Sequence, residues 1–583
     1  MSLIYHYTHT ETIATTGFFS CEPDASYTEA ELCEALEASP MDSFLHAALF
    51  RRLRKQPVHD LLKLFPLVYD STTDTFTKPA LASVLWECAL HEASLEELYK
   101  AFPVDTSARL AQASPLLSLL RHAVRSDSAA DQEKRAWWQK LYFQNINWLT
   151  PLPSSAKAQE YALLSSEELA DITASMQASE SLEALYARLH PVEAPAENGF
   201  ETASDLLRCA SDRLLEAGLL TGCEMRHEAS LAPIALLRSR NIDLQVRQKR
   251  MDYVLQGEAT AYGRGLSLAQ ARISCCMEIV ERASAYVSLE EKGQKTFVTL
   301  RKKPLPLICD SFVHLRKAGQ NALDPEILGS YGNCAEYSLH WLVATDPTGR
   351  EVLVPAQAVF LFFNADEPEC FSATSTGLAS GTSLAQAKLN ALLEILERDA
   401  LASMPFQRER CFLAKSRNPR LQALLDDYAA RNIRLQFQDL THEFGLPVLS
   451  AFVRAEDGSL VRAQACKLSG AEAALAALTE TPWPYCLTQP APYGRATGAG
   501  LAGLGERYLE DLPAYSFSQA EQALHFVEAR LLSLGRTPLY VDITRADLDF
   551  PVVRAFLPGL ESSDDSQSVP CSRFQWRVLR TDA

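Results

Sequence analysis

Four glutamates in two matching windows are the residues of this chain best placed to do chemistry. Glu278 and Glu281 stand three residues apart in one window, and Glu394 and Glu397 stand three apart in the other. Residues at this spacing share one face of a helix, about 60° apart around its axis. Carboxylates on one face repel each other, and such hard oxygen ligands suit Mg²⁺ accompanied by substrate phosphates. The windows therefore predict a site between two acidic helices for Mg²⁺ and a triphosphate.

The two windows form an internal repeat. Residues 265–282 and 381–398 are identical at ten of eighteen aligned positions, with no gap. Each window has a glycine-containing stretch that we interpret as a loop entering a helix, followed by Ser-x-x-Gln, which predicts a capping box. The capping pairs are Ser267 with Gln270, and Ser383 with Gln386. An uncovered helix N-terminus behind glycine is a natural phosphate site.

Ordinary surface ion pairs are the alternative explanation of the glutamates. Glu278 stands four residues before Arg282, and Glu394 four before Arg398, which is the spacing of a helical ion pair. A single window would favour this alternative. Two windows that match this closely favour the nucleotide and metal site.

Bulk properties narrow the class of protein. The net charge of -18 argues against a nucleic-acid partner, because phosphate binding needs clustered lysine and arginine. We expect neither a signal peptide nor a transmembrane helix, since no long uncharged apolar run occurs. The 14 cysteines include no Cys-x-x-Cys pair, which disfavours zinc and predicts a reducing, cytoplasmic location.

Two regions with different sequence patterns lie on either side of a proline-containing stretch. Residues 1–190 carry apolar side chains at helical spacing, for example in 27–53 and 81–102, and predict an all-α N-terminal domain. Residues 191–200 read as a linker. Residues 201–583 predict an α/β domain, mixed α+β with subdomains. Its expected strands lie at 351–354, 359–363, 448–453 and 539–543, and a third capped helix is expected at 469–480.

With these features the chain resembles the YcaO family of ATP-dependent enzymes. Three stretches carry the resemblance, which covers roughly residues 195–561. The first is the GRG loop at 263–265 with the following acidic helix, and the second is STGLASG at 375–381 with ERDA after the second acidic helix. The third is VDITRAD at 541–547, followed by PVVR and LPGLE.

The resemblance implies how the site is divided among residues. It implies that Mg²⁺ is held by Glu278, Glu281, Glu394 and Glu397. It implies nucleotide contacts from Ser274 and Asn390, and phosphate contacts from Arg264 and Arg398. A serine on the first helix of the domain also contacts ATP in the family, and Ser204 is the matching candidate, although a helix cap at Thr202 or Ser204 explains it equally well.

Some positions depart from the family pattern. Arg264 replaces the usual lysine, and Gln386 replaces a frequent glutamate. The third helix is followed by residues 481–485, TPWPY, where relatives have a glutamine and an arginine, and Arg495 is a candidate substitute. The chain ends without the proline-rich tail of azoline-forming members, so the sequence favours thioamidation over azoline synthesis.

Three functions remain open from the sequence. The first is ATP-dependent activation of a backbone amide in a peptide or protein substrate, by a homodimer whose helical N-terminal region recruits the substrate or a sulfur-transfer or recognition partner. The second is an ATP-binding accessory protein that assists methylthiolation of a ribosomal protein. The third is a scaffold whose nucleotide site is inactive.

Overall fold

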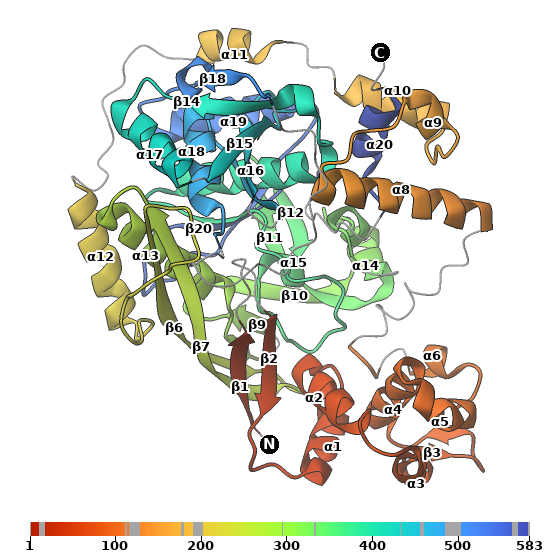
Figure 1. Cartoon of the computed structure of the whole chain (residues 1–583). Helices are drawn as coiled ribbons and strands as arrows, with labels where there is room; N and C mark the ends of the chain where they lie inside the picture. Colours follow the sequence, from red (N-terminus) through yellow and green to blue (C-terminus); the bar gives the residue numbers. More distant parts are fainter. Residues whose placement is uncertain are drawn as a thin grey trace.

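In the part of the chain that it describes, the computed structural model contains a large β-sheet, a smaller five-stranded sheet and a two-stranded sheet, joined and covered by helices (Figure 1). It describes residues 2–10, 18–110, 113–115, 129–176, 180–189, 202–293, 295–330, 334–431, 433–454, 460–483, 503–561 and 569–580. The expected mixed α/β class is confirmed. The expected linker at 191–200 lies outside the described residues, so the division into two domains stays a prediction.

The N-terminus begins in the large sheet. β1 (Leu3–Thr10) pairs antiparallel with β2 (Phe18–Pro23) and parallel with β7 (Asp252–Gly265). Alternate side chains of β1, Leu3, Tyr5 and Tyr7, are buried, which is the two-residue period of a strand. The helical N-terminal region is confirmed, but it is not all-α, because its first two elements complete the sheet of the second region.

The helices that follow pack around a central buried helix, α4. The described elements of this part are α1 (Glu29–Ala38), α2 (Ser43–Leu53), α3 (Val58–Val68), β3 (Tyr69–Asp70), β4 (Thr75–Phe76), α4 (Pro79–His91), the 3-10 turn Ala93–Leu95, α5 (Glu96–Ala101) and α6 (Thr106–Arg109). The helices expected at 27–53 and 81–102 are thus present. They share one continuous hydrophobic core with the large sheet.

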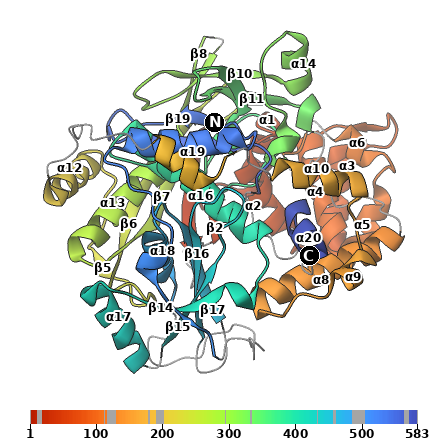
Figure 2. The same ribbon diagram turned by 90° about the horizontal axis from the view of Figure 1, so that it is seen from above.

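A second group of helices meets the C-terminus. It comprises α8 (Ala129–Trp148), α9 (Ser155–Gln159), α10 (Ser166–Ser175) and the last helix, α20 (Ser572–Leu579), whereas α11 (Leu182–Leu189) packs on α19 (Ala520–Ser533). In both views α20 lies beside α8, α9 and α10 (Figure 2). Trp138 and Tyr142 of α8 are buried together with Phe574 of α20. The C-terminus is therefore anchored by apolar packing.

The large sheet has thirteen strands among the described residues, in the order β13-β20-β19-β11-β10-β9-β8-β6-β7-β1-β2, with β12 added to β11 and β5 to β6. Its remaining strands are β5 (Met225–Arg226), β6 (Ile234–Arg247), β8 (Leu289–Lys292), β9 (Lys295–Val298), β10 (Leu305–Ser311), β11 (Ser338–Thr345), β12 (Glu351–Pro355), β13 (Leu378–Ser380), β19 (Leu539–Asp542) and β20 (Val552–Phe556). The strands expected at 351–354 and 539–543 are confirmed as β12 and β19.

The small sheet has the order β17-β16-β15-β14-β18. Its strands are β14 (Cys411–Lys415), β15 (Arg434–Asp439), β16 (Val448–Arg454), β17 (Leu460–Cys466) and β18 (Glu506–Tyr508). The strand expected at 448–453 is confirmed as β16. The strand expected at 359–363 is wrong, because these residues leave a short helix and form a loop. Phe360 and Phe362 are buried there without a strand ladder, so burial alone explains their apolar run.

Two helices hold the acidic residues where the sheets meet. α13 (Leu268–Ala285) packs on β6, β7 and α12 (Ala203–Glu216), and α16 (Leu384–Ser403) packs on β20 and β13 of the large sheet and on β17 of the small one. The other helices are α14 (Phe312–Lys317), α15 (Ala356–Val359), α17 (Pro419–Ala430), α18 (Gly470–Glu480) and α19 (Ala520–Ser533), with 3-10 turns at Pro325–Leu328, Cys334–Glu336, Arg408–Arg410 and Leu509–Asp511.

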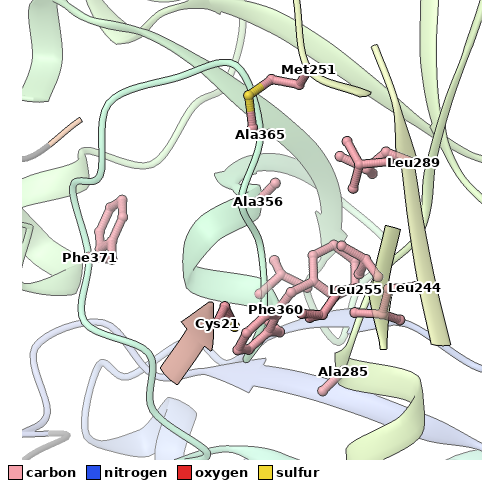
Figure 3. Packing of buried hydrophobic residues seen from close by; sticks show 14 of the residues in the cluster. Cys21, Leu244, Met251, Leu255, Ala285, Leu289, Ala356, Phe360, Ala365 and Phe371 are labelled. Atoms are coloured by element: carbon pink, nitrogen blue, oxygen red, sulfur yellow. The ribbon is translucent and has the colours of Figure 1, made fainter. Parts of the chain in front are cut away.

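The main core lies between β2, β7 and the loop after α15. Figure 3 shows Cys21 of β2 beside Phe360, with Leu255 of β7 and Ala285, the last residue of α13, close by. A separate core surrounds α16 and α19 and includes Leu182 and Leu185 of α11. No helix among the described residues is long and apolar enough to cross a membrane.

Candidate nucleotide and metal site

Both acidic helices start with the same local structure. The hydroxyl of the N-cap Ser267 accepts a hydrogen bond from Gln270 N at 3.3 Å, and Ser383 accepts one from Gln386 N at 3.1 Å. The glutamine side chains accept from the residues before the caps, Leu266 N at 3.1 Å and Thr382 N at 2.7 Å. The expected N-caps are confirmed. Their reciprocal hydrogen bond reaches one residue earlier than in a standard capping box.

Glycine is required where each preceding strand crosses its helix. A Cβ on Gly265 would lie 2.9 Å from Ala271 N, and one on Gly381 would lie 2.5 Å from Ala387 N. The two glycines stand six residues before the atoms they approach, so the repeat builds one strand-to-helix crossing twice. Residues 262–265, expected as a loop, form the last residues of β7.

Alanine at Gly263 is expected to destabilise the protein by about 1–3 kcal/mol, because its Cβ would lie 2.0 Å from Ala271 O and 2.5 Å from Cys275 Cβ. Neither the helix backbone nor a Cβ can move without shifting α13. Thermal unfolding of Gly263→Ala compared with wild type measures the effect. The matched control is Gly505→Ala, where the added Cβ meets no atom of the described residues within 4 Å. Equal unfolding midpoints for the two variants would contradict the crossing as described.

The glutamates of α13 and α16 are mostly withdrawn from solvent. The exposed fraction of the side chain is 27% for Glu278, 17% for Glu281 and 11% for Glu397. Arg282 lies 3.9 Å from Glu278 and 3.4 Å from Glu281, and Arg398 Nη2 lies 3.7 Å from Glu397 Oε1. The predicted pair of Glu278 with Arg282 exists but is long, and on α16 Arg398 is paired with Glu397, where the spacing predicts Glu394. These ion pairs do not account for burying so many carboxylates in one place.

The two helices face each other through their carboxylates. Burial raises the pKa of Glu281 to about 8, against the neighbouring Arg282, and the charge of Glu394 on the other helix raises it further. Burial likewise raises the pKa of Glu394, which Arg398 and Arg282 oppose. Each helix therefore contributes charge to one shared site, and in the protein alone burial favours the protonated form of Glu281.

Glu480, the last residue of α18, joins this site, although it was not among the residues expected there. Burial raises the pKa of Glu397 to about 8, and Glu480 is the next largest contribution to that rise. Lys467, before α18, acts in the opposite direction. The helix itself was expected at residues 469–480. Its expected capping box is absent, since the side chain of Ser469 makes no capping hydrogen bond.

Arg554 of β20 also lies in the site. Its Nε donates to Ala358 O at 3.0 Å and its Nη2 to Thr374 O at 2.8 Å. Burial lowers the pKa of Arg554 to about 10, against the charges of Glu394 and Glu281. Its Nη1 is buried and has no hydrogen-bond partner in the described part of the chain. A charged residue inside the apolar run 552–556 was the sequence signal, because a buried charge needs a partner.

The donor set fits Mg²⁺ that is bound together with phosphate. Five carboxylates and four basic side chains meet here: Glu278, Glu281, Glu394, Glu397 and Glu480, with Arg282, Arg398, Lys467 and Arg554. Among the described residues, no three histidine, cysteine, aspartate or glutamate side chains are close enough to hold a metal ion unaided. Mg²⁺ takes few protein carboxylates and completes its shell with phosphate and water. The free donor of Arg554 suits an anionic ligand.

The other residues expected in the site take different positions on and around the two acidic helices. Asn390 Nδ2 donates to Ser380 O at 3.1 Å, and Ser380 Oγ donates to Met277 O of α13 at 3.1 Å, so Asn390 helps to tie the two helices together. Ser274 is exposed on α13 and Arg264 is half-buried at the end of β7. Their nucleotide contacts, like that of Arg398, stay predictions.

Ser204 is exposed in the first turn of α12, two residues after the N-cap Thr202. Farther along α12, the hydroxyl of Ser211 lies 3.7 Å from Cys276 Sγ of α13. The role of Ser204 stays a prediction, and Thr202 supplies the cap. Arg495 and most of the segment after the third helix lie outside the described residues.

Residues 262–561 match the model of a family described as YcaO cyclodehydratases that bind ATP and Mg²⁺. This match covers half of the chain. The chain belongs to the YcaO family. It is 29% identical over 329 residues to an uncharacterised protein of Methanothermobacter thermautotrophicus, covering 51% of this chain and 81% of that protein. It is 26% identical over 198 residues to an uncharacterised protein encoded in the tfuA 3′ region of Rhizobium leguminosarum bv. trifolii, covering 33% and 44%.

Solved structures of YcaO proteins are similar at lower identity. The YcaO protein of Methanopyrus kandleri bound with AMPPCP and Mg²⁺ has a TM-score of 0.46 and 20% identity, covering 64% of this chain and 94% of that one. A heterocyclase in complex with substrate and cofactor has a TM-score of 0.46 and 16% identity, covering 65% and 55%. The predicted family and the predicted cofactors, ATP and Mg²⁺, are confirmed by the family match. The chain is thus a member of an ATP-dependent YcaO enzyme family.

Proposed function

We propose that this YcaO protein uses ATP and Mg²⁺ to activate a backbone amide of a peptide or protein substrate. The observation that carries the proposal is the shared acidic site, in which Glu281 of α13 and Glu394 of α16 interact and the buried Nη1 of Arg554 has no hydrogen-bond partner among the described residues. Such a site suits a triphosphate with its metal ions. Membership of the cyclodehydratase family supports transfer of phosphate to an amide oxygen.

The chemistry begins at the carbonyl carbon of the amide. A nucleophile, either a cysteine, serine or threonine side chain of the substrate or an external sulfide, adds to this carbon and places a negative charge on the oxygen. The oxygen attacks the γ-phosphorus of ATP, and ADP leaves. The C–O bond then breaks, phosphate departs and a proton is lost. The product is an azoline with a side-chain nucleophile, or a thioamide with sulfide. Of these two products we propose the thioamide.

The residues of the site bind and orient the phosphates. The four helix glutamates would hold Mg²⁺, and its charge would favour the ionised forms of Glu281 and Glu397, which burial opposes. Arg554 and Arg398 would donate to phosphate oxygens as charge moves toward the leaving ADP. Mg²⁺, when bound, neutralises phosphate oxygens and makes the phosphorus more electrophilic. The predicted roles of Ser274, Asn390, Arg264 and Ser204 belong to this proposal.

The test compares the proteins of the source organism with those of a strain that lacks the gene. We expect at least one backbone modification, a sulfur-for-oxygen exchange or a loss of water, to disappear in the deletion strain. Wild-type protein should restore it, and Glu394→Gln should not. Peptide mass spectrometry locates the change. The matched control is Glu521→Gln, an exposed glutamate on α19, which should restore the modification fully.

The predicted accessory role gives a different result in the same experiment. A protein that only assists methylthiolation would bind Mg-ATP, and its deletion would remove a methylthio group from a ribosomal protein without any backbone change. That outcome would contradict the proposed amide chemistry. The predicted homodimer, the partner proteins and the cytoplasmic location stay predictions.

A further inference from the structure

A cavity of about 230 Å³ lies between the N-terminal region and the loop that follows α15. Its walls come from β2, from α2 and from residues 357–373. Cys21, Phe360 and Phe371, labelled in Figure 3, are among its lining residues. Ligand pockets for larger molecules measure roughly 300–1,000 Å³, so this cavity is the right size for a single long side chain.

Phenylalanine rings form much of the cavity wall. Six of them line it: Phe19, Phe44, Phe360, Phe362, Phe363 and Phe371. Phe362 is the centre of the group, with its ring centroid 5.1 Å from that of Phe19 and 5.3 Å from that of Phe44. Phe19 is only partly buried, since 49% of the residue is exposed to solvent. Several ring faces around one space are the arrangement that attracts an organic cation.

The charges around the cavity are predominantly acidic. The lining carries two carboxylates, Glu367 and Glu369, and one guanidinium, that of Arg51. Arg51 Nη2 lies 2.6 Å from Glu22 Oε1, so its charge is already matched by a further carboxylate. Glu367 Oε2 lies 2.7 Å from His340 Nδ1, so this carboxylate also has a nearby partner. The overall charge of -18 adds a long-range field that favours a positive ligand.

A third carboxylate lies directly behind the wall at Asp42, beside the lining residue Ser43. Asp42 accepts hydrogen bonds from Tyr5 Oη at 2.7 Å, from Asn364 Nδ2 at 3.0 Å and from Phe44 N at 3.1 Å, all of them neutral donors. Burial raises the pKa of Asp42 and also that of Glu369. A cation inside the cavity would stabilise the ionised form of both groups.

The cavity is held open by a hydrogen-bond network. Gln357 Nε2 donates to Pro368 O at 2.7 Å, and Gln357 Oε1 accepts from Cys370 N at 2.8 Å. Arg250 donates two hydrogen bonds to the carboxylate of Asp366, from Nε to Oδ2 and from Nη2 to Oδ1, each at 2.8 Å. These contacts fix the loop in advance of binding, which lowers the entropy cost of taking up a ligand.

We propose that this cavity binds a lysine or arginine side chain of the polypeptide that the enzyme modifies. The proposal rests on the proposed function in taking that polypeptide as the substrate. The apolar stem of such a side chain would lie along the phenylalanine rings, and its charged end would face the carboxylates. The rings of Phe362 and Tyr286 stack at 5.0 Å, and Tyr286 follows the last residue of α13. Tyr286 is five residues, roughly 7.5 Å of helix rise, beyond Glu281.

The same loop connects the cavity to the nucleotide site. After the lining residue Ala373 the chain reaches Thr374, whose carbonyl accepts from Arg554. A basic side chain in the cavity would therefore anchor the polypeptide next to the acidic helices, at a fixed distance from the amide to be modified. The cavity would select substrates by the spacing between a basic residue and the reacting amide.

The experiment measures binding of fluorescently labelled pentapeptides Gly-Ser-X-Ser-Gly to the full-length protein by anisotropy. X is lysine, arginine or norleucine, which has the apolar stem without the charge. We expect lysine and arginine to bind about tenfold more tightly than norleucine. Phe19→Leu, which keeps apolar area but removes a ring face, should reduce this preference about threefold or more, as should Glu369→Gln. The matched control, Glu97→Gln on exposed α5, should keep it.

Each alternative has its own outcome. Equal binding of the norleucine and lysine peptides would overturn the proposal and mark the cavity as an apolar site. Binding of n-butylammonium as tight as that of the lysine peptide would assign the cavity to a free amine and overturn a polypeptide ligand. Titration of the same samples with Mg-AMPPCP tests the nucleotide site separately. The protein could fail to bind Mg-AMPPCP and still bind the lysine peptide more tightly than the norleucine peptide. That result would contradict only the proposed function.

Discussion

Glu394→Gln is expected to lower ATP turnover by at least about 100-fold while leaving the protein folded, because it removes one charged oxygen from the shared phosphate and metal site. Burial raises the pKa of Glu394, and three arginines, Arg398, Arg282 and Arg554, oppose that rise. The carboxylate is thus costly to keep in the protein alone. Removing its charge should not reduce thermal stability, and a small increase is expected.

Three measurements separate catalysis from folding in this variant. Turnover is followed by release of phosphate, nucleotide affinity by calorimetry with Mg-AMPPCP, and folding by the thermal midpoint. We expect weaker nucleotide binding and an unchanged or higher midpoint. The exposed Glu521→Gln should match wild type in all three. Turnover of Glu394→Gln within a fewfold of wild type would remove this residue from the site.

Arg573→Met is expected to destabilise the protein by about 3–5 kcal/mol, because it leaves a buried aspartate without its main ion partner. Asp399, two residues after Glu397 on α16, is fully buried. Arg573 Nη1 of α20 donates to Asp399 Oδ2 at 2.8 Å, and Nη2 contacts Oδ1. His442 Nε2 lies 3.1 Å from Oδ2, and Glu561 N donates to Oδ1 at 2.9 Å. The last helix is thereby tied to the helix that carries Glu394 and Glu397.

The pH dependence of this effect has a definite sign. Burial tends to raise the pKa of Asp399, but Arg573 and His442 outweigh it and hold the pKa well below its usual range. In wild type, this contribution to stability is present above the unfolded pKa of about 4 and is lost as the pH falls toward the folded value. Without Arg573, burial dominates and raises the pKa. The deficit of Arg573→Met should therefore be larger at pH 7 than at pH 4.

Urea unfolding at the two pH values measures both effects. The double variant Asp399→Asn/Arg573→Met, which removes both charges, should recover at least half of the lost free energy at pH 7. Mg-AMPPCP affinity reports whether α16 is still held in place, and we expect it to fall in the single variant and to recover in the double one. A single variant as stable as wild type at pH 7 would contradict the role assigned to this pair.

The sequence alone was sufficient for the features that depend on neighbouring residues. The N-cap serines and the glutamates three residues apart are both local. A hydrogen bond or a helix face across three or four residues is fixed once the helix forms. That is why the repeat predicted two equivalent acidic helices, and why the family resemblance and its cofactors were confirmed.

Only the tertiary structure decided which distant residues complete the site. Arg554, Glu480 and Lys467 come from separate elements of the fold, and Asp399 meets Arg573 across 174 positions of the chain. The two strands at the N-terminus join β7, some 250 residues later. No local periodicity encodes such pairings, since they follow from how buried surfaces fit together and from the cost of leaving a buried charge unmatched. The sequence by itself determined the two acidic helices, and the packing of the sheets around them determined that they share one site.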